Sequence, residues 1–171
     1  KNIIKKKYYL YKTYSALKLF KKTNYHSINK LINYKKFIKN NRSLLFKNFN
    51  YYKRRYLSYQ NHNYLFHKFV FKNLKSFFIL KRNNDKSGLN YVILDHFGSQ
   101  KIYSKHLSHL INNQNKLIFL SKKQINKPEY ELVNKINLKI GFIKKFNIKK
   151  KFFLSNKDVF LGDTDIFITT K

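Results

Sequence analysis

Residues 91–120 read YVILDHFGSQKIYSKHLSHLINNQNKLIFL, and this stretch sets the expected fold. The apolar, β-prone run at 91–94 predicts a buried strand. A Gly-Ser pair at 98–99 then supplies a turn and a candidate helix cap, and apolar side chains recur at helical spacing over 102–111. A second apolar run at 117–120 predicts another strand. The stretch is therefore expected to form a strand, a helix and a strand in that order.

Further strands are expected toward the C-terminus, after a polar loop at 81–88. Apolar side chains alternate over 136–142 with the period of a strand that buries one face. The run at 166–169 predicts a last strand. Because helices and strands follow one another without a regular alternation, we expect an α+β fold: a small mixed sheet with packed helices, preceded by a basic helical extension. The expected division is 1–60 for the extension and 61–171 for the α+β domain.

The N-terminal extension shows two helical stripes. Apolar and aromatic side chains recur three and four positions apart in each, which places them on one helical face. The stripes consist of Ile28, Leu31, Tyr34 and Ile38, and of Leu45, Phe49, Tyr52, Tyr56 and Tyr59. The basic run Lys53, Arg54 and Arg55 lies off the second stripe. We expect amphipathic helices that pack an aromatic face on a neighbour and turn a basic face toward phosphates.

The charge distribution indicates a polyanionic partner. The chain has 38 Lys and Arg against 7 Asp and Glu, a formal net charge of +31. The first 84 residues hold 22 basic residues and no acid, and the rest hold 16 basic and 7 acidic residues, so the two parts carry +22 and +9 (16 − 7). A folded chain with so little internal compensation repels itself. Because the basic residues are spread along the whole chain, nucleic acid is the polyanion that fits best.

Composition narrows the classes of protein to which the chain could belong. The apolar runs are far too short to span a bilayer, and the chain has no Cys. Lys outnumbers Arg by 34 to 4, and Asn, Ile, Tyr and Phe are abundant. These residues have A/T-rich codons, which suggests an A/T-rich genome such as that of an organelle.

Candidate catalytic and metal-binding groups are sparse. The 4 Gly are scattered, so they form no phosphate-binding loop. His106 and His109 lie three apart on the expected helix and could provide two ligands of a metal, but no third ligand is evident. Asp163 and Asp165 are two apart, and among so many Lys we interpret them as structural ion pairs rather than as an acid–base or Mg²⁺ site. We therefore expect no catalytic residues, no metal, no cofactor and no enzymatic activity.

Four blocks of the chain, in order, are similar to one known family. The block at 64–73 looks like the end of an early helix that runs into a Phe/Tyr-x-Asn turn, and the block at 90–98 looks like a strand of that family. The block at 110–123 resembles the family's LISGQKPVITKAKKS, and the block at 161–171 resembles a late strand. The family is large-subunit ribosomal protein five, whose members bind 5S rRNA. Its RNA- and tRNA-facing loop would fall at 125–141, which is longer here and lacks the family's Arg and Gly residues.

The resemblance implies a place in the central protuberance of a large ribosomal subunit. The chain would be a structural constituent of a mitochondrial ribosome, located in the matrix and encoded by the organelle. Its implied partners are large-subunit rRNA, 5S rRNA where the ribosome has one, and neighbouring ribosomal proteins, with no membrane involved. Members of the family also approach the P-site tRNA and contact a protein of the small-subunit head.

The candidate RNA-binding residues are basic or carry a side-chain amide. Lys and Arg neutralise phosphates, and Asn and Gln can bond base edges or 2′-hydroxyls. The candidates are Lys53, Arg54, Arg55, Lys72, Asn73, Lys101, Lys105, Gln114, Lys116, Lys122 and Lys123.

Two alternatives remain open on the sequence. The chain could be another mitoribosomal or organelle RNA-binding protein of unrelated fold, because biased composition produces chance matches. It could also be a peripheral membrane protein held on anionic lipid by its basic N-terminal helices. A DNA-processing enzyme would need a catalytic constellation, and none was found in the sequence.

Overall fold

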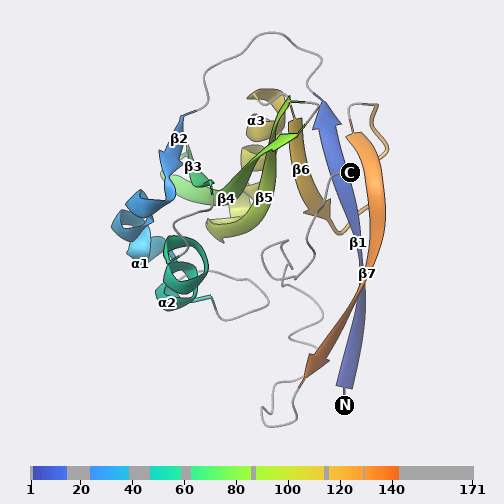
Figure 1. Ribbon diagram of the computed structural model, residues 1–171, viewed down its shortest axis with the longest axis horizontal. Helices are drawn as coiled ribbons and strands as arrows, with labels where there is room; N and C mark the ends of the chain where they lie inside the picture. The colour runs from blue at the N-terminus through green and yellow to red at the C-terminus, as the bar shows by residue number, and fades with distance from the viewer. Residues whose placement is uncertain are drawn as a thin grey trace.

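One seven-stranded mixed sheet organises the protein, as the computed structural model shows (Figure 1). The structure describes residues 2–14, 24–38, 47–58, 63–85, 88–113, 116–128 and 130–142. The strands are β1 (Asn2–Tyr14), β2 (Tyr25–Ser27), β3 (Tyr64–Phe71), β4 (Leu74–Asp85), β5 (Gly88–Gly98), β6 (Lys116–Ser121) and β7 (Tyr130–Phe142). They lie in the order β2-β3-β4-β5-β6-β1-β7, and every neighbouring pair is antiparallel except β5 and β6. The expected α+β class with a mixed sheet is confirmed.

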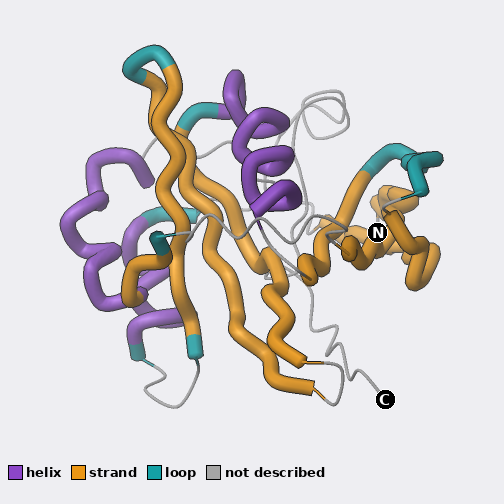
Figure 2. The backbone as a smooth tube through the Cα atoms, turned by 90° about the horizontal axis from the view of Figure 1, so that it is seen from above, coloured by secondary structure: helices purple, strands orange, loops and turns teal. Residues whose placement is uncertain are grey.

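Helices cover both faces of the sheet (Figure 2). They are η1 (Ile28–Tyr34, 3₁₀), α1 (Lys35–Ile38), α2 (Phe49–Tyr52), η2 (Lys53–Leu57, π-helical), η3 (Gln100–Ile102, 3₁₀) and α3 (Tyr103–Asn113). Helices η1, α1, α2 and η2 pack on one face of the sheet, and α3 packs on the other. The sheet is therefore buried on both sides around β4 and β5.

Successive side chains of β4 point to opposite faces of the sheet and contribute to a hydrophobic core on each face. Phe77 and Ile79 point to the N-terminal helices, where the Phe77 ring stacks on that of Phe97 with 4.5 Å between centroids and 5° between planes. Phe78 and Leu80 point to the opposite face, toward α3. These four side chains are fully buried, so the centre of β4 has no polar face.

The strand–helix–strand prediction for residues 91–120 is confirmed. Strand β5 leads through Gly98, which has a positive φ of 91°, into η3 and α3. A Cβ on Gly98 would lie 2.5 Å from the carbonyl oxygen of Lys75, so only glycine fits this turn. Strand β6 then pairs parallel with β5, with Tyr91 opposite Leu117.

The N-terminal stripes are confirmed where the structure describes them. Ile28, Leu31 and Ile38 are buried in the core on η1 and α1. Tyr52 and Tyr56 are buried on α2 and η2. Leu45, Tyr59 and the expected strand at 166–169 lie outside the described residues.

Within the expected extension, residues 2–14 form strand β1 rather than a helix. This strand lies between β6 and β7 and pairs with β7 from Asn2 opposite Phe142 to Thr13 opposite Tyr130. The hydrogen-bond partners lie more than 100 residues along the chain, and they satisfy the backbone whatever the local helical pattern.

Two expectations on local structure are wrong, and a third is confirmed. Residues 64–71 form β3 and not the end of a helix, because they pair along their length with β4. Residues 81–85 continue β4 instead of forming a loop, and the register brings Asp85 opposite Gly88. The strand expected at 136–142 is confirmed as the second half of β7, which begins at Tyr130, inside the segment where the family's loop would fall. In the first two cases, pairing with a neighbouring strand decides the outcome.

Candidate nucleic-acid interface

The β3–β4 hairpin ends in a tight turn that presents two of the predicted RNA-binding residues. Lys72 and Asn73 are both exposed and have positive φ values of 45° and 61°. Positive φ at both central positions defines a two-residue turn whose twist matches that of the flanking strands, and Asn tolerates it well. The turn therefore holds these side chains at the tip of a rigid hairpin.

Lysines flank this hairpin end on both faces of the sheet, and two phenylalanine rings hold them. The Lys105 and Lys72 ammonium groups lie 3.7 Å and 5.8 Å from the centre of the Phe71 ring. On the face covered by α1, the Lys75 and Lys36 ammonium groups lie 5.0 Å and 5.4 Å from the centre of the Phe37 ring. Such contacts are worth about 0.5–1 kcal/mol at exposed sites and orient a cation without neutralising it. We call these four lysines and two rings the hairpin cluster.

The predicted binding residues fall into three groups in the fold. Lys72, Asn73 and Lys105 belong to the hairpin end, and Lys101 is exposed on η3, which contacts β4. A second group, Lys53, Arg54 and Arg55, lies on η2.

The third group is divided between the two ends of β6. Lys116 is half-buried at the start of β6, while Lys122 and Lys123 are exposed just after its end. A six-residue strand is about 20 Å long, so these lysines do not form one cluster. Gln114 lies outside the described residues.

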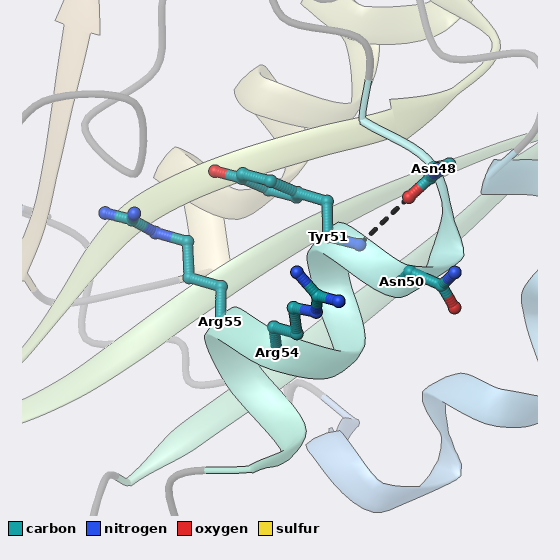
Figure 3. Close-up of a pocket in the computed structure, with 5 residues that line it drawn as sticks. All are labelled: Asn48, Asn50, Tyr51, Arg54 and Arg55. Atoms are coloured by element: carbon teal, nitrogen blue, oxygen red, sulfur yellow. Dashed lines mark hydrogen bonds between the residues drawn. The ribbon is translucent and has the colours of Figure 1, made fainter.

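An open pocket of about 560 Å³ lies beside the second group (Figure 3). Its described lining consists of Asn48, Asn50, Tyr51, Arg54 and Arg55. The Asn48 side-chain oxygen accepts a hydrogen bond from the Tyr51 backbone N–H at 3.0 Å and so caps α2. The sequence pattern singled out the two arginines, but it did not predict the pocket or the two asparagines.

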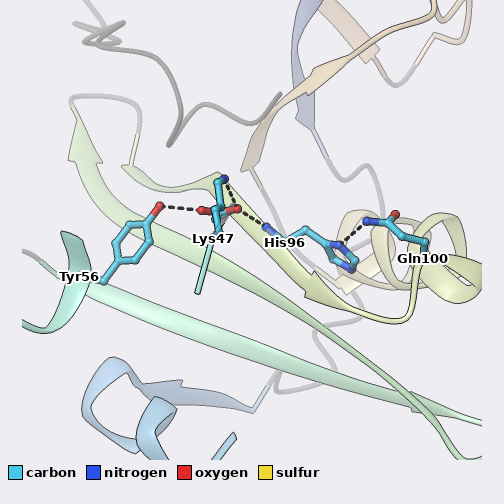
Figure 4. Close-up of polar contacts among 5 residues, drawn as sticks. Lys47, Tyr56, His96 and Gln100 are labelled. Carbon is cyan, nitrogen blue, oxygen red and sulfur yellow. Dashed lines mark hydrogen bonds and ion pairs between the residues drawn. The ribbon is translucent and has the colours of Figure 1, made fainter. Parts of the chain in front are cut away.

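A buried salt bridge fixes the chain where it enters this pocket (Figure 4). The Lys47 ammonium group lies 2.7 Å from a carboxylate oxygen of Asp95, and both side chains are fully buried. The Tyr56 hydroxyl donates to the other Asp95 oxygen at 3.2 Å. Burial, followed by the Asp95 charge, raises the pKa of Tyr56 well above its usual value. One carboxylate thus anchors both the start of α2 and the end of η2 to β5.

A buried hydrogen-bond relay lies on the other face, between the sheet and α3. The Gln100 amide nitrogen lies 3.2 Å from His96 Nδ1, and His96 Nε2 lies 2.8 Å from the Ser76 hydroxyl. The same hydroxyl lies 2.8 Å from His106 Nδ1, and His106 Nε2 lies 2.7 Å from His67 Nδ1. Figure 4 shows the Gln100 end of this histidine relay.

The relay has one consistent direction of donation. The Gln100 amide nitrogen can only donate, so His96 Nδ1 accepts and His96 Nε2–H donates to Ser76. The single hydroxyl proton of Ser76 then goes to His106 Nδ1, and His106 Nε2–H donates to His67. Burial lowers the pKa of all three histidines, to about 3 for His96, and neutral rings are what this pattern requires.

His106 thus has a structural role that the sequence pattern did not assign. His109, three residues on, is exposed on α3, and its ring lies 5.6 Å from that of His67. Within the described ranges, no three His, Cys, Asp or Glu side chains are grouped so that they could hold a metal ion. Among the same residues, no helix has the length and apolar character to cross a membrane.

Comparisons with protein-family models, with curated proteins and with solved structures found no match to this chain.

Proposed function

We propose that the protein is a structural constituent of the large subunit of a mitochondrial ribosome, where it binds rRNA in the central protuberance. The observation that carries the proposal is the hairpin cluster, in which lysines are oriented by aromatic rings. The charge on these lysines is not cancelled by the rings, and phosphate groups are its natural counterions. Binding of this kind needs no reaction, so the protein would act as an RNA-bound scaffold rather than as an enzyme.

The local fold supports the ribosomal assignment in its central part. The blocks at 90–98 and 110–123, which resemble ribosomal protein five, correspond to β5, the end of α3, and β6 with the residues after it. Their strand–helix–strand arrangement is what the resemblance implied. The proposal rests on these two blocks, because the block at 64–73 forms a strand and a turn and the block at 161–171 lies outside the described residues. Large-subunit rRNA is the proposed main partner, with 5S rRNA, neighbouring ribosomal proteins and the P-site tRNA as further proposed contacts.

Sedimentation of organellar ribosomes tests the proposal. An epitope-tagged copy of the full chain should migrate with the large subunit in a density gradient and remain there at moderate salt. Higher salt concentrations should release it progressively, because salt cations compete with the protein's lysines and arginines for the phosphates. Migration with the small subunit, or recovery in the soluble fractions alone, would contradict the proposal.

A further inference from the structure

We propose that the pocket on α2 and η2 binds a single unpaired nucleotide of RNA. In this site, Arg54 and Arg55 hold the phosphate, while the Tyr51 ring and the Asn50 amide contact the base. The inference rests on the proposed function and makes it specific, since it assigns to one site the recognition of an RNA loop rather than a duplex. The pocket volume of about 560 Å³ lies within the range of small-ligand sites.

The pocket chemistry matches a nucleotide. Two guanidinium groups offer forks that fit phosphate oxygens, and the side-chain amides can donate to and accept from a base edge. Tyr51 is half-buried and supplies an aromatic ring of the kind on which RNA-binding proteins stack unpaired bases. The described lining carries no carboxylate that would repel a phosphate.

The two arginines are unusual in this chain. Basic positions are Lys in 34 cases and Arg in 4, and two of the four arginines are neighbours in this pocket. Codon bias toward A and T favours Lys wherever a positive charge is sufficient. An Arg pair is therefore expected where the planar fork is needed, because Lys offers only a point charge.

The backbone beneath the pocket is held rigidly. Lys47, which precedes the lining residue Asn48, is bound to Asp95, and Tyr52 and Tyr56 are fully buried in the core. Both arginines lie in the π-helical turn, which the Ser58 N–H closes on the Lys53 carbonyl at 3.0 Å. Turns of this type are rare and occur frequently at functional sites. A site built on so fixed a support loses little conformational freedom when it binds.

The sequence spacing places the lining on one side of the helix. Asn48, Tyr51 and Arg54 follow one another at intervals of three residues, and Arg55 lies four after Tyr51. Side chains at these intervals are neighbours on a helical surface. Figure 3 shows Arg54 and Arg55 rising from the same turn, with Tyr51 beside them.

The test measures binding of two RNAs by the wild-type chain and by a variant in which Arg is replaced with Lys, so that the net charge is unchanged. Fluorescence anisotropy would measure binding of the full chain to an RNA hairpin with a seven-nucleotide loop and to a blunt duplex of equal length. The double variant Arg54→Lys/Arg55→Lys should weaken loop binding on the order of tenfold and leave duplex binding unchanged, since the net charge is kept. Arg82→Lys, on β4 and outside the lining, is the matched control and should change neither affinity.

A second variant and two competitors identify what the pocket recognises. Asn50→Ala, at an exposed position, should also reduce loop binding without affecting the duplex. AMP or GMP should compete with the loop more strongly than inorganic phosphate does, because the base contributes. Equal competition by inorganic phosphate would overturn the nucleotide assignment in favour of a simple anion site.

The outcomes separate this inference from the function on which it rests. A loop preference that survives Arg54→Lys/Arg55→Lys, or that falls equally in Arg82→Lys, would overturn the pocket alone. A wild-type chain that binds neither RNA would overturn the pocket and the proposed function together. Thermal unfolding of each variant would confirm that the fold is unchanged.

Discussion

We expect the buried histidines of the relay to make the stability of the protein sensitive to acid. His67, His96 and His106 have pKa values below the usual 6.5, with burial as the main cause in each case. The unfolded chain therefore binds protons that the folded chain does not, and folding stability falls as the pH drops below about 6.5. The loss continues until the folded histidines are themselves protonated, near pH 3 for His96.

Urea unfolding at pH 7.5 and at pH 5 measures this effect. Each histidine that takes up a proton on unfolding should lower the free energy of unfolding by about 1.4 kcal/mol per pH unit below its unfolded pKa. The carboxylates that titrate near pH 4 contribute little in this interval. Equal stability at the two pH values would show that the rings are not held neutral.

The Ser76 hydroxyl is the group on which the relay depends most. Ser76→Ala would leave a His96 donor and a His106 acceptor without their partner, at a cost of about 1–3 kcal/mol for each unsatisfied group. Ser104→Ala, at an exposed position on α3, is the matched control and should change stability by less than about 0.5 kcal/mol. Urea unfolding of both variants checks the difference, and equal effects would mean that the relay does not stabilise the fold.

Among the elements, the β3–β4 hairpin is the one that should determine RNA affinity. Lys72→Glu/Lys105→Glu would reverse two charges at the hairpin end. It should weaken RNA binding strongly and lower the slope of log affinity against log salt by about 0.9 for each duplex phosphate that the variant no longer neutralises. Lys127→Glu/Lys135→Glu reverses two exposed charges elsewhere and serves as the control. Equal weakening by the two variants would show that binding is spread over the whole surface.

Elements with a clear local period could be predicted from the sequence, and elements defined by distant pairing could not. The helix at 102–111 and the strand at 91–94 have the apolar spacing that their environment requires. In β3, Phe66 and His67 are both buried because helices cover both faces of the sheet, so the period of two is lost. In β1 the run Lys5 to Lys7 resembles a solvated segment, and only the pairing with β7 makes it a strand.

The residues of the candidate site also divide into those visible in the local sequence and those that depend on distant contacts. The lysines and arginines were found because a charge that lacks a local acid is visible in the sequence. The pocket was missed because Asn48 and Asn50 acquire a role only when α2 is anchored through Lys47 and Asp95, which are 48 residues apart. The relay was missed for the same reason, since its members come from three strands and two helices.

At the scale of the whole molecule, most of the positive charge has no internal acid to balance it. The chain carries a formal net charge of +31. The buried carboxylate of Asp95 is already paired with Lys47 inside the fold. Self-repulsion of this size destabilises the compact state and is relieved when phosphates bind. The acid-free N-terminal residues include β1, which pairs with the sheet, so the missing acids do not mark an added extension alone.

Ultraviolet crosslinking of purified organellar large subunits, with identification of both the peptide and the nucleotide, tests the central claim most directly. We predict crosslinks between large-subunit rRNA and the peptides that contain the β3–β4 hairpin or residues 47–58. Crosslinks of these peptides to small-subunit rRNA or messenger RNA, or the absence of any crosslink from both, would contradict the account.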